Sequence, residues 1–282
     1  MGDMTPLRPS RADSKMTPHP RVGSHHEDDA RYIGRGNNGD GNIINMAPDA
    51  RGGLGNPYKL NDHTRAESVF KFAFTLLDEY TKNVALRDEI ATLNDQKLGC
   101  FCRNSDEDAP ACHGDVLATW IDYLTDPQGT AVGVCGSRTI YDRFGDMIGS
   151  DAAHLVERIL RQTDQLDTIT NDIDTVIHGA NMDSPDAWGS QYADNHPDAI
   201  NHDIPAPWDT FGKPAGPIRN GAVISDLATY EDNLLVAFWD GYSAGTKNTI
   251  DRALEIGIPV EVVDLTDKQT RKKYMTTDMI NL

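Results

Sequence analysis

The stretch LLVAFWDGYSAGT, which ends at Thr246, joins an apolar run to residues that could bind an anion. An apolar run that stops at Trp-Asp-Gly before helix-like sequence predicts a strand, a turn and a helix start. At a helix start the free backbone N–H groups and the helix dipole attract an anion. Ser243 and Thr246 add hydroxyl donors, and Gly245 lets a phosphate approach the backbone. The simpler interpretation is a serine N-cap with a glycine beside it.

Three other segments place polar residues where a predicted strand ends. The first is CGSR, in which Arg138 offers a planar fork suited to phosphate. The second is HGANMDSPD, and the third is a rigid loop that ends at Arg219. Each segment alone is also explained by a turn, a helix cap or a surface arginine. Together with the first stretch they give these candidate ligand-binding residues: Gly136, Ser137, Arg138, His178, Gly179, Asp186, Arg219, Asn220, Asp240, Ser243, Gly245 and Thr246.

These segments need a sheet to bring them together. After the breaker-rich segment 125–130, five apolar runs alternate with helical patterns up to residue 265. This alternation predicts an α/β fold: a doubly wound, mostly parallel five-stranded sheet over residues 131–265, with ligands at the carboxyl ends of its strands. The segment 139–149, TIYDRFGDMIG, is expected to form a lid or a longer turn. Residues 30–125 predict a smaller α/β domain, and residues 1–29 and 266–282 predict tails, the first of them flexible.

The charge balance limits which classes of partner the protein can bind. The net charge is −18, and the 44 acidic residues comprise 35 Asp and 9 Glu. Such a surface is typical of proteins that work in concentrated salt, which screens the mutual repulsion of the carboxylates. It disfavours nucleic acid as a partner. The sequence shows neither a membrane-spanning run nor a secretory signal, so we expect a cytoplasmic protein. A homo-oligomer is one of the assemblies that the sequence allows.

The C-terminal motifs resemble the SLOG superfamily, in its YspA-type, YpsA-related branch. The resemblance rests on GSR, HGA, PAPWDTFGKPAGPIRN and AFWDGYSAGT, in that order. It implies a Rossmann-like fold and a nucleotide or nucleotide-derived ligand. Related members are phosphoribohydrolases, with a Glu three residues after Gly-Thr. That position is Thr249 here, so catalysis would need another carboxylate in place of the Glu, such as Asp240. Arg219 matches the family's Arg, and the candidate catalytic residues are therefore Arg219 and Asp240.

A second set of residues lies in the N-terminal half. Cys100, Cys102, Cys112 and His113 are soft ligands that could hold a zinc ion. Cys100 and Cys102 are two apart on a predicted strand, so we expect them on the same side. A thiolate activated at a helix start is one alternative, and plain buried thiols are another. A second pocket is expected around Arg35, Asn56, Cys100, Cys102, Cys112, His113 and Asp115.

This half resembles a phage-associated domain of unknown function, number 4326. The resemblance rests on YIGR, GLGNPY, LGCFC and CHGDVL, over about residues 31–124. It implies no activity. With the salt-adapted composition, it suggests a virus or mobile element of a halophile, which would place the protein in the host cytoplasm.

Three functions follow from these features. The first is a nucleotide-binding sensor or processor that requires no cofactor. The second is a hydrolase that cleaves the N-glycosidic bond of a nucleoside monophosphate, for which a carboxylate must stabilise the oxocarbenium-like transition state. The third is a structural or interaction protein. Because Thr249 replaces the expected Glu, the sequence favours binding over hydrolysis.

Overall fold

The chain folds into two compact units. The structure is a computed structural model, and it describes residues 18–36, 43–44, 52–103, 111–163 and 173–275. Unit 1 spans residues 1–127 and unit 2 spans residues 128–282, so the division falls inside the breaker-rich segment 125–130. Each unit has its own sheet.

In its described residues, unit 1 combines a small parallel sheet with three helices. Its elements are β1 (Val22–Ser24), β2 (Arg31–Tyr32), α1 (Arg65–Tyr80), α2 (Val84–Thr92), β3 (Leu98–Cys100) and α3 (His113–Thr125). The strand order is β1-β3-β2. Helix α1 begins at a capping box, in which Thr64 accepts from the Glu67 N–H and the Glu67 carboxylate accepts from the Thr64 N–H. Phe72, Leu117 and Trp120 are fully buried in its core.

Two predictions for unit 1 were wrong. Residues 22–24, assigned to a flexible tail, form β1, because they pair in parallel with β3. A strand of three residues is too short to show periodicity. Cys102 does not share a strand face with Cys100, because β3 ends at Cys100 and the chain turns there. Residues 1–17 of the predicted tail lie outside the described residues.

Unit 2 is a five-stranded parallel sheet with helices between its strands. Its elements are β4 (Thr130–Gly136), α4 (Arg138–Ile148), a 3-10 turn η2 (Gly149–Asp151), α5 (Ala152–Gln162), β5 (Thr175–His178), α6 (Asp186–Asp194), β6 (Ile200–Asp203), α7 (Trp208–Phe211), α8 (Ala215–Leu227), β7 (Asp232–Phe238), α9 (Ala244–Glu255), β8 (Val260–Val263) and α10 (Lys268–Tyr274). The order β6-β5-β4-β7-β8, all parallel, confirms the predicted doubly wound, Rossmann-like fold.

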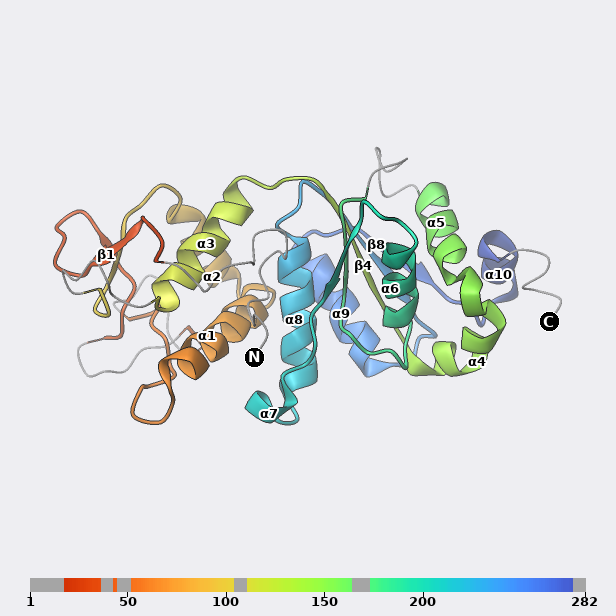
Figure 1. The fold of residues 1–282 in the computed structure, drawn as a ribbon, viewed down its shortest axis with the longest axis horizontal. Helices are drawn as coiled ribbons and strands as arrows, with labels where there is room; N and C mark the ends of the chain where they lie inside the picture. The colour runs from red at the N-terminus through yellow and green to blue at the C-terminus, as the bar shows by residue number, and fades with distance from the viewer. Residues whose placement is uncertain (1–17, 37–42, 45–51, 104–110, 164–172, 276–282) are drawn as a thin grey trace. The chain divides into compact units, whose positions relative to one another are not determined.

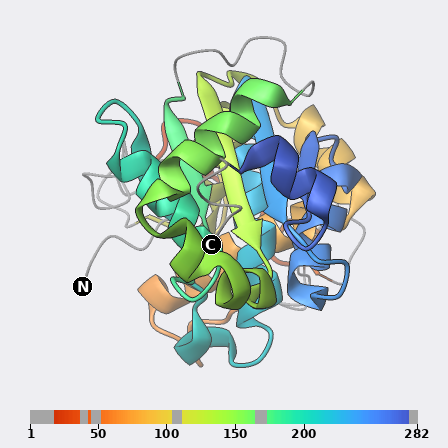
Figure 2. The ribbon, with the colours of Figure 1, turned by 90° about the vertical axis from the view of Figure 1, so that its right-hand side faces the viewer.

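Both faces of this sheet are covered. Helices α4, α5, α6 and α10 lie on one side of the strands, and α8 and α9 lie on the other (Figure 1). Figure 2 views the chain from the side of α4, α5 and α10, which lie in front of the strands. Alternate residues of β4 divide between the faces: Val132 and Val134 join the core with α5 and α6, whereas Gly133 faces Leu227 of α8. Strands buried on both faces explain the continuous apolar runs.

The strand order sets where a ligand can bind. The chain leaves β4 toward one face and β7 toward the other, so the two connections separate at the carboxyl ends of these neighbouring strands. Such a switch point opens a crevice between the diverging loops. The predicted motif CGSR begins in the last residues of β4, and AFWDGYSAGT begins in the last residues of β7.

Two further segments differ from the prediction. Residues 139–149 were expected to form a lid or longer turn, but all of them except Gly149 belong to α4, whose Ile140, Phe144 and Ile148 are buried at helical spacing. Part of the predicted C-terminal tail forms α10, whose Tyr274 is buried against the same core. Residues 276–282 lie outside the described residues. None of the helices in the described part of the chain is long and apolar enough to cross a membrane.

Candidate functional site

A cavity of about 750 Å³ opens at the carboxyl edge of the unit 2 sheet. It is lined at the switch point by residues that follow β4, β5 and β7 and by the first turns of α8 and α9. Ten of the twelve predicted ligand-binding residues line it: Gly136, Arg138, Gly179, Asp186, Arg219, Asn220, Asp240, Ser243, Gly245 and Thr246. The volume is typical of a small-molecule site.

The start of α9 presents free donors to this cavity. Ser243 caps the helix, because its hydroxyl accepts from the Thr246 N–H at 3.3 Å. Within the described part of the chain, no protein group accepts from the N–H groups of Ala244 and Gly245. A Cβ added at Gly245 would meet only the Ser243 hydroxyl, at 4.0 Å, so this backbone borders open space. The geometry is that of an anion site at a helix start.

Asp240 organises the loop that precedes α9. Its carboxylate accepts from the Thr139 hydroxyl, from the Ser137 hydroxyl at 3.2 Å, and from the Tyr242 and Ser243 N–H groups at 3.1 and 3.4 Å. Desolvation raises the pKa of Asp240, but these hydrogen bonds outweigh it and hold the pKa below its usual value. The carboxylate is therefore ionised and already well supplied with donors.

Arg219 and Asp186 form an ion pair inside the cavity. Arg219 Nη1 donates to the Gly179 carbonyl and lies 3.3 Å from Asp186 Oδ2. Asp186 also accepts from the Asn181 N–H at 3.1 Å. The sequence places these residues more than thirty positions apart, and the pair becomes visible only once β5 and α8 are in place.

Two predicted ligand-binding residues do not line the cavity. Ser137 is buried, and its hydroxyl lies between Asp240 and Thr246. His178 is buried with both ring nitrogens engaged: Nδ1 accepts from the Ala180 N–H at 3.1 Å, so Nε2 donates to Asn201 Oδ1 at 2.8 Å. Both side chains point into the core and hold the loops beside the cavity through their hydrogen bonds.

Several lining residues were not predicted from the sequence. They are Cys135, Thr139, Asn181, Ser184, Trp208, Gly216, Pro217, Val223, Tyr242, Ala244, Asn248 and Thr249. Trp208 and Tyr242 stand at the opening with exposed fractions of 58% and 90%. The signal that could have found them is that both lie inside the motifs PAPWDTFGKPAGPIRN and AFWDGYSAGT. Asn248 and Thr249 follow from helical spacing after Gly245.

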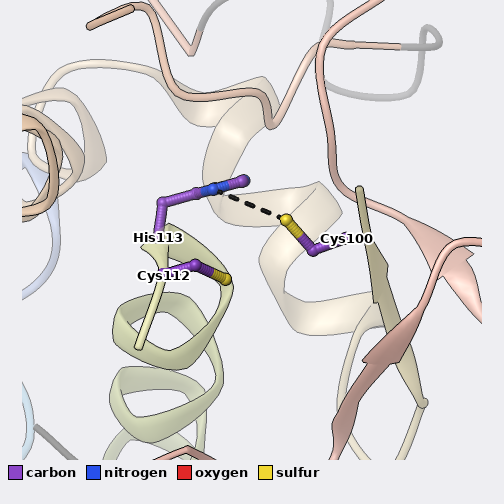
Figure 3. Close-up of side chains that lie close together, drawn as sticks. All are labelled: Cys100, Cys112 and His113. Atoms are coloured by element: carbon purple, nitrogen blue, oxygen red, sulfur yellow. Dashed lines mark hydrogen bonds between the residues drawn. The ribbon is translucent and has the colours of Figure 1, made fainter. Parts of the chain in front are cut away.

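Unit 1 brings three soft ligands together. Cys100 Sγ, Cys112 Sγ and a ring nitrogen of His113 all lie within 4.8 Å of one another, and all three residues are buried. Figure 3 shows His113 and Cys112 at the start of α3, with Cys100 opposite them at the end of β3. His113 Nδ1 lies 3.8 Å from Cys100 Sγ, and its Nε2 lies 2.9 Å from the Ile33 carbonyl. Because a carbonyl only accepts, Nε2 carries the proton and Nδ1 has a free lone pair.

Backbone donors point at both buried sulfurs. The Cys102 N–H lies 3.5 Å from Cys100 Sγ, and the Gly114 N–H lies 3.4 Å from Cys112 Sγ. Such donors stabilise thiolates. The adjacent residues Cys112 and His113 both contribute, although adjacent ligands rarely chelate together. They can do so here because Cys112 is the N-cap of α3 and His113 is its first residue. This cluster could hold a metal ion.

The three thiols do not titrate alike. Hydrogen bonding with the Cys100 and Cys112 sulfurs lowers the pKa of Cys102. Hydrogen bonding to Cys102 raises the pKa of Cys100 to about 12, and hydrogen bonding to Cys100 and Cys102 raises the pKa of Cys112. Burial lowers the pKa of His113, which keeps its ring neutral.

A second cavity of about 250 Å³ adjoins this cluster. Six of the seven residues predicted for a second pocket line it: Arg35, Asn56, Cys100, Cys102, Cys112 and His113. The seventh, Asp115, does not. It is fully buried and accepts from Arg103 at 2.5 Å, from the Cys112 N–H at 2.6 Å and from the His19 N–H at 2.7 Å. Asp115 completes the capping box of α3.

The comparison with protein families matches unit 1 alone. Residues 20–123 match a family described as "Domain of unknown function (DUF4326)". The match begins at residue 20 and so includes β1, in keeping with the structure. No curated protein and no solved structure matches the chain.

Proposed function

We propose that unit 2 binds a nucleotide or a nucleotide-derived ligand at the carboxyl edge of its sheet. The observation that carries the proposal is the start of α9, where the N–H groups of Ala244 and Gly245 face a cavity of about 750 Å³. The resemblance to the SLOG superfamily supports the same ligand class. Unit 2 would serve as the sensor or processor of that ligand.

The surroundings of α9 favour an anion. Helices α4, α6, α8 and α9 all begin at this edge, so the positive ends of their dipoles converge on it. Arg138, the first residue of α4, lines the cavity. Of the two carboxylates that line the cavity, Asp186 is paired with Arg219, and the oxygens of Asp240 already accept from four donors. A phosphate therefore meets donors and partial positive charge.

Aromatic residues at the opening suit a nucleobase. Trp208 and Tyr242 lie far outside the core, yet both line the cavity. Stacking of a base on an aromatic ring contributes about 1–3 kcal/mol per base. We assign the phosphate to α9 and the base to this rim.

A thermal-shift screen of the full chain tests the proposal. In molar KCl, a nucleoside 5′-monophosphate is expected to raise the melting temperature, and Arg138→Gln is expected to reduce that rise. A matched control is Arg158→Gln, which changes an arginine of α5 that does not line the cavity. Absence of any shift with every nucleotide, and an unchanged response in Arg138→Gln, would favour a structural role.

Hydrolysis of the same ligand is the second candidate. The ion pair of Arg219 with Asp186 favours it, because a carboxylate held in the cavity could stabilise the oxocarbenium-like transition state of base release. Thr249, which occupies the position of the family's Glu, disfavours it. Base release from a nucleoside monophosphate, lost in Asp186→Asn, would reverse our ranking of binding above hydrolysis.

We also propose that the cysteine and histidine cluster of unit 1 binds zinc. Two sulfurs and one imidazole nitrogen form a donor set that zinc prefers, and the bond from Nε2 to Ile33 holds His113 in the required tautomer. Metal analysis of the purified full chain is expected to give one zinc per chain, lost in Cys112→Ser. Cys135→Ser, a thiol of unit 2, is the control.

A further inference from the structure

We propose that the zinc of unit 1 keeps one coordination position open toward the 250 Å³ cavity, and that a small anion occupies it. This inference rests on the proposed zinc site and goes beyond it, because it makes unit 1 a ligand-binding centre. Structural zinc sites are closed by four protein ligands, whereas sites with three protein ligands accept water or a ligand in the fourth position.

The structure supplies three ligands. Cys100, Cys112 and His113 bring their donor atoms within 4.8 Å of one another, and the thiol of Cys102 is not part of that group. Cys102 lies in the turn after β3 and lines the cavity. It is half-buried, whereas the three residues of the cluster are buried. Its backbone N–H instead donates to Cys100 Sγ. The Cys102 sulfur therefore contacts those of Cys100 and Cys112 but lies outside the group that these two form with His113.

The buried carboxylate of Asp115, in the first turn of α3, already has hydrogen-bond partners of its own. Asp115 accepts from the Arg103 guanidinium, from the Cys112 N–H and from the His19 N–H. Turning it toward a metal would break its buried ion pair with Arg103, which costs several kcal/mol. Asp115 also lines no part of the cavity. It supports the start of α3 and with it the position of Cys112 and His113.

The cavity has the charge of an anion site. Arg35 and Arg65 line it, and its described lining residues include no Asp or Glu, in a chain whose net charge is −18. Arg35 is held in place by bonds to the Asn56 and Tyr58 carbonyls at 2.7 and 3.0 Å. A zinc ion bound by two thiolates and a neutral imidazole adds no net charge, so it leaves the positive charge of the two arginines unchanged. Arg65 also lies within hydrogen-bonding reach of the Cys102 sulfur, and an anion would be a second partner for it. A phosphate or carboxylate oxygen fits both the metal and the arginines.

Cobalt substitution of the full chain tests the open position. Cobalt(II) reports its ligands in the visible spectrum, so the protein is loaded with cobalt and titrated with azide and with inorganic phosphate. We expect both anions to change the cobalt bands in a saturable way. Cys102→Ser is expected to keep one metal per chain and the wild-type spectrum, and Arg65→Gln is expected to weaken phosphate binding about tenfold while keeping the metal.

Each other result overturns a defined part of the inference. Loss of metal or of thiolate-to-cobalt absorption in Cys102→Ser would show a closed site with four protein ligands, and the zinc proposal would stand without the open position. A spectrum that neither anion changes would do the same. Failure of the wild-type chain to retain zinc or cobalt would refute the zinc site itself. Cys135→Ser controls for general effects of thiol removal.

Discussion

Replacing Gly245 by alanine separates the proposed ligand-binding role of the α9 start from its role in folding. A Cβ at this position meets nothing closer than the Ser243 hydroxyl at 4.0 Å, and Gly245 lies inside the helix with an ordinary backbone conformation. The substitution should therefore stabilise unit 2 by about 0.5–1 kcal/mol, because alanine loses less backbone entropy than glycine on folding. For a domain of this size that corresponds to a rise in melting temperature of about 1–4 °C.

The same methyl group should damage binding. It projects into the cavity where the phosphate approaches the N–H groups of Ala244 and Gly245. Loss of one hydrogen bond to a charged group costs about 1.5–3 kcal/mol, or about 10- to 150-fold in Kd. Calorimetric titration and a melting curve of the same sample measure both effects.

A matched variant and a clear contrary result complete this test. In Gly145→Ala the added Cβ makes ordinary contacts with the Tyr141 ring at 3.5 Å, in a helix position outside the 750 Å³ cavity at the start of α9. It should match the stabilisation and leave Kd unchanged. Wild-type affinity in Gly245→Ala would refute the placement of the phosphate at α9.

Three further predictions concern stability. The first concerns the ion pair of His202 Nδ1 with Asp226 Oδ2, which lie 3.0 Å apart. Burial lowers the pKa of His202, but the Asp226 carboxylate more than offsets this, so the pKa of His202 is raised. The pair therefore stabilises unit 2 fully below the unfolded pKa of about 6.5, and the contribution is lost as pH rises through the folded pKa; denaturant melts should show this loss in wild type and not in Asp226→Asn. Because salt screens a net charge of −18, molar KCl should raise the melting temperature above that in dilute buffer, and an unchanged or lower value would argue against adaptation to concentrated salt. A zinc chelator should lower the melting temperature of the full chain, and that of Cys112→Ser should not respond.

The sequence predicted the fold of unit 2 well because its signals are local. Five apolar runs separated by helical patterns specify a doubly wound sheet, and the motifs at the strand ends predict which loops form the edge. The short strand β1 and the helix α10 escaped prediction. Both are held by tertiary contacts, β1 by pairing with β3 and α10 by burial of Tyr274.

The candidate sites were predictable by position but less so by orientation. A residue at the end of a buried strand can point into the loop or into the core, and only the structure shows that His178 points inward and that Asp115 caps α3. The pairing of Arg219 with Asp186 depends on two loops whose separation in the chain carries no distance information. The cysteine cluster was visible as composition, whereas the exclusion of Cys102 depends on where β3 ends.

The central claim is that the α9 edge of unit 2 binds a nucleotide. Isothermal titration calorimetry of the full chain with the common nucleoside 5′-monophosphates, in molar KCl, tests it most directly. We predict saturable binding with one site per chain for at least one of them, strongly weakened in Gly245→Ala. No binding heat with any nucleotide, from a chain that melts cooperatively under the same conditions, would contradict the account.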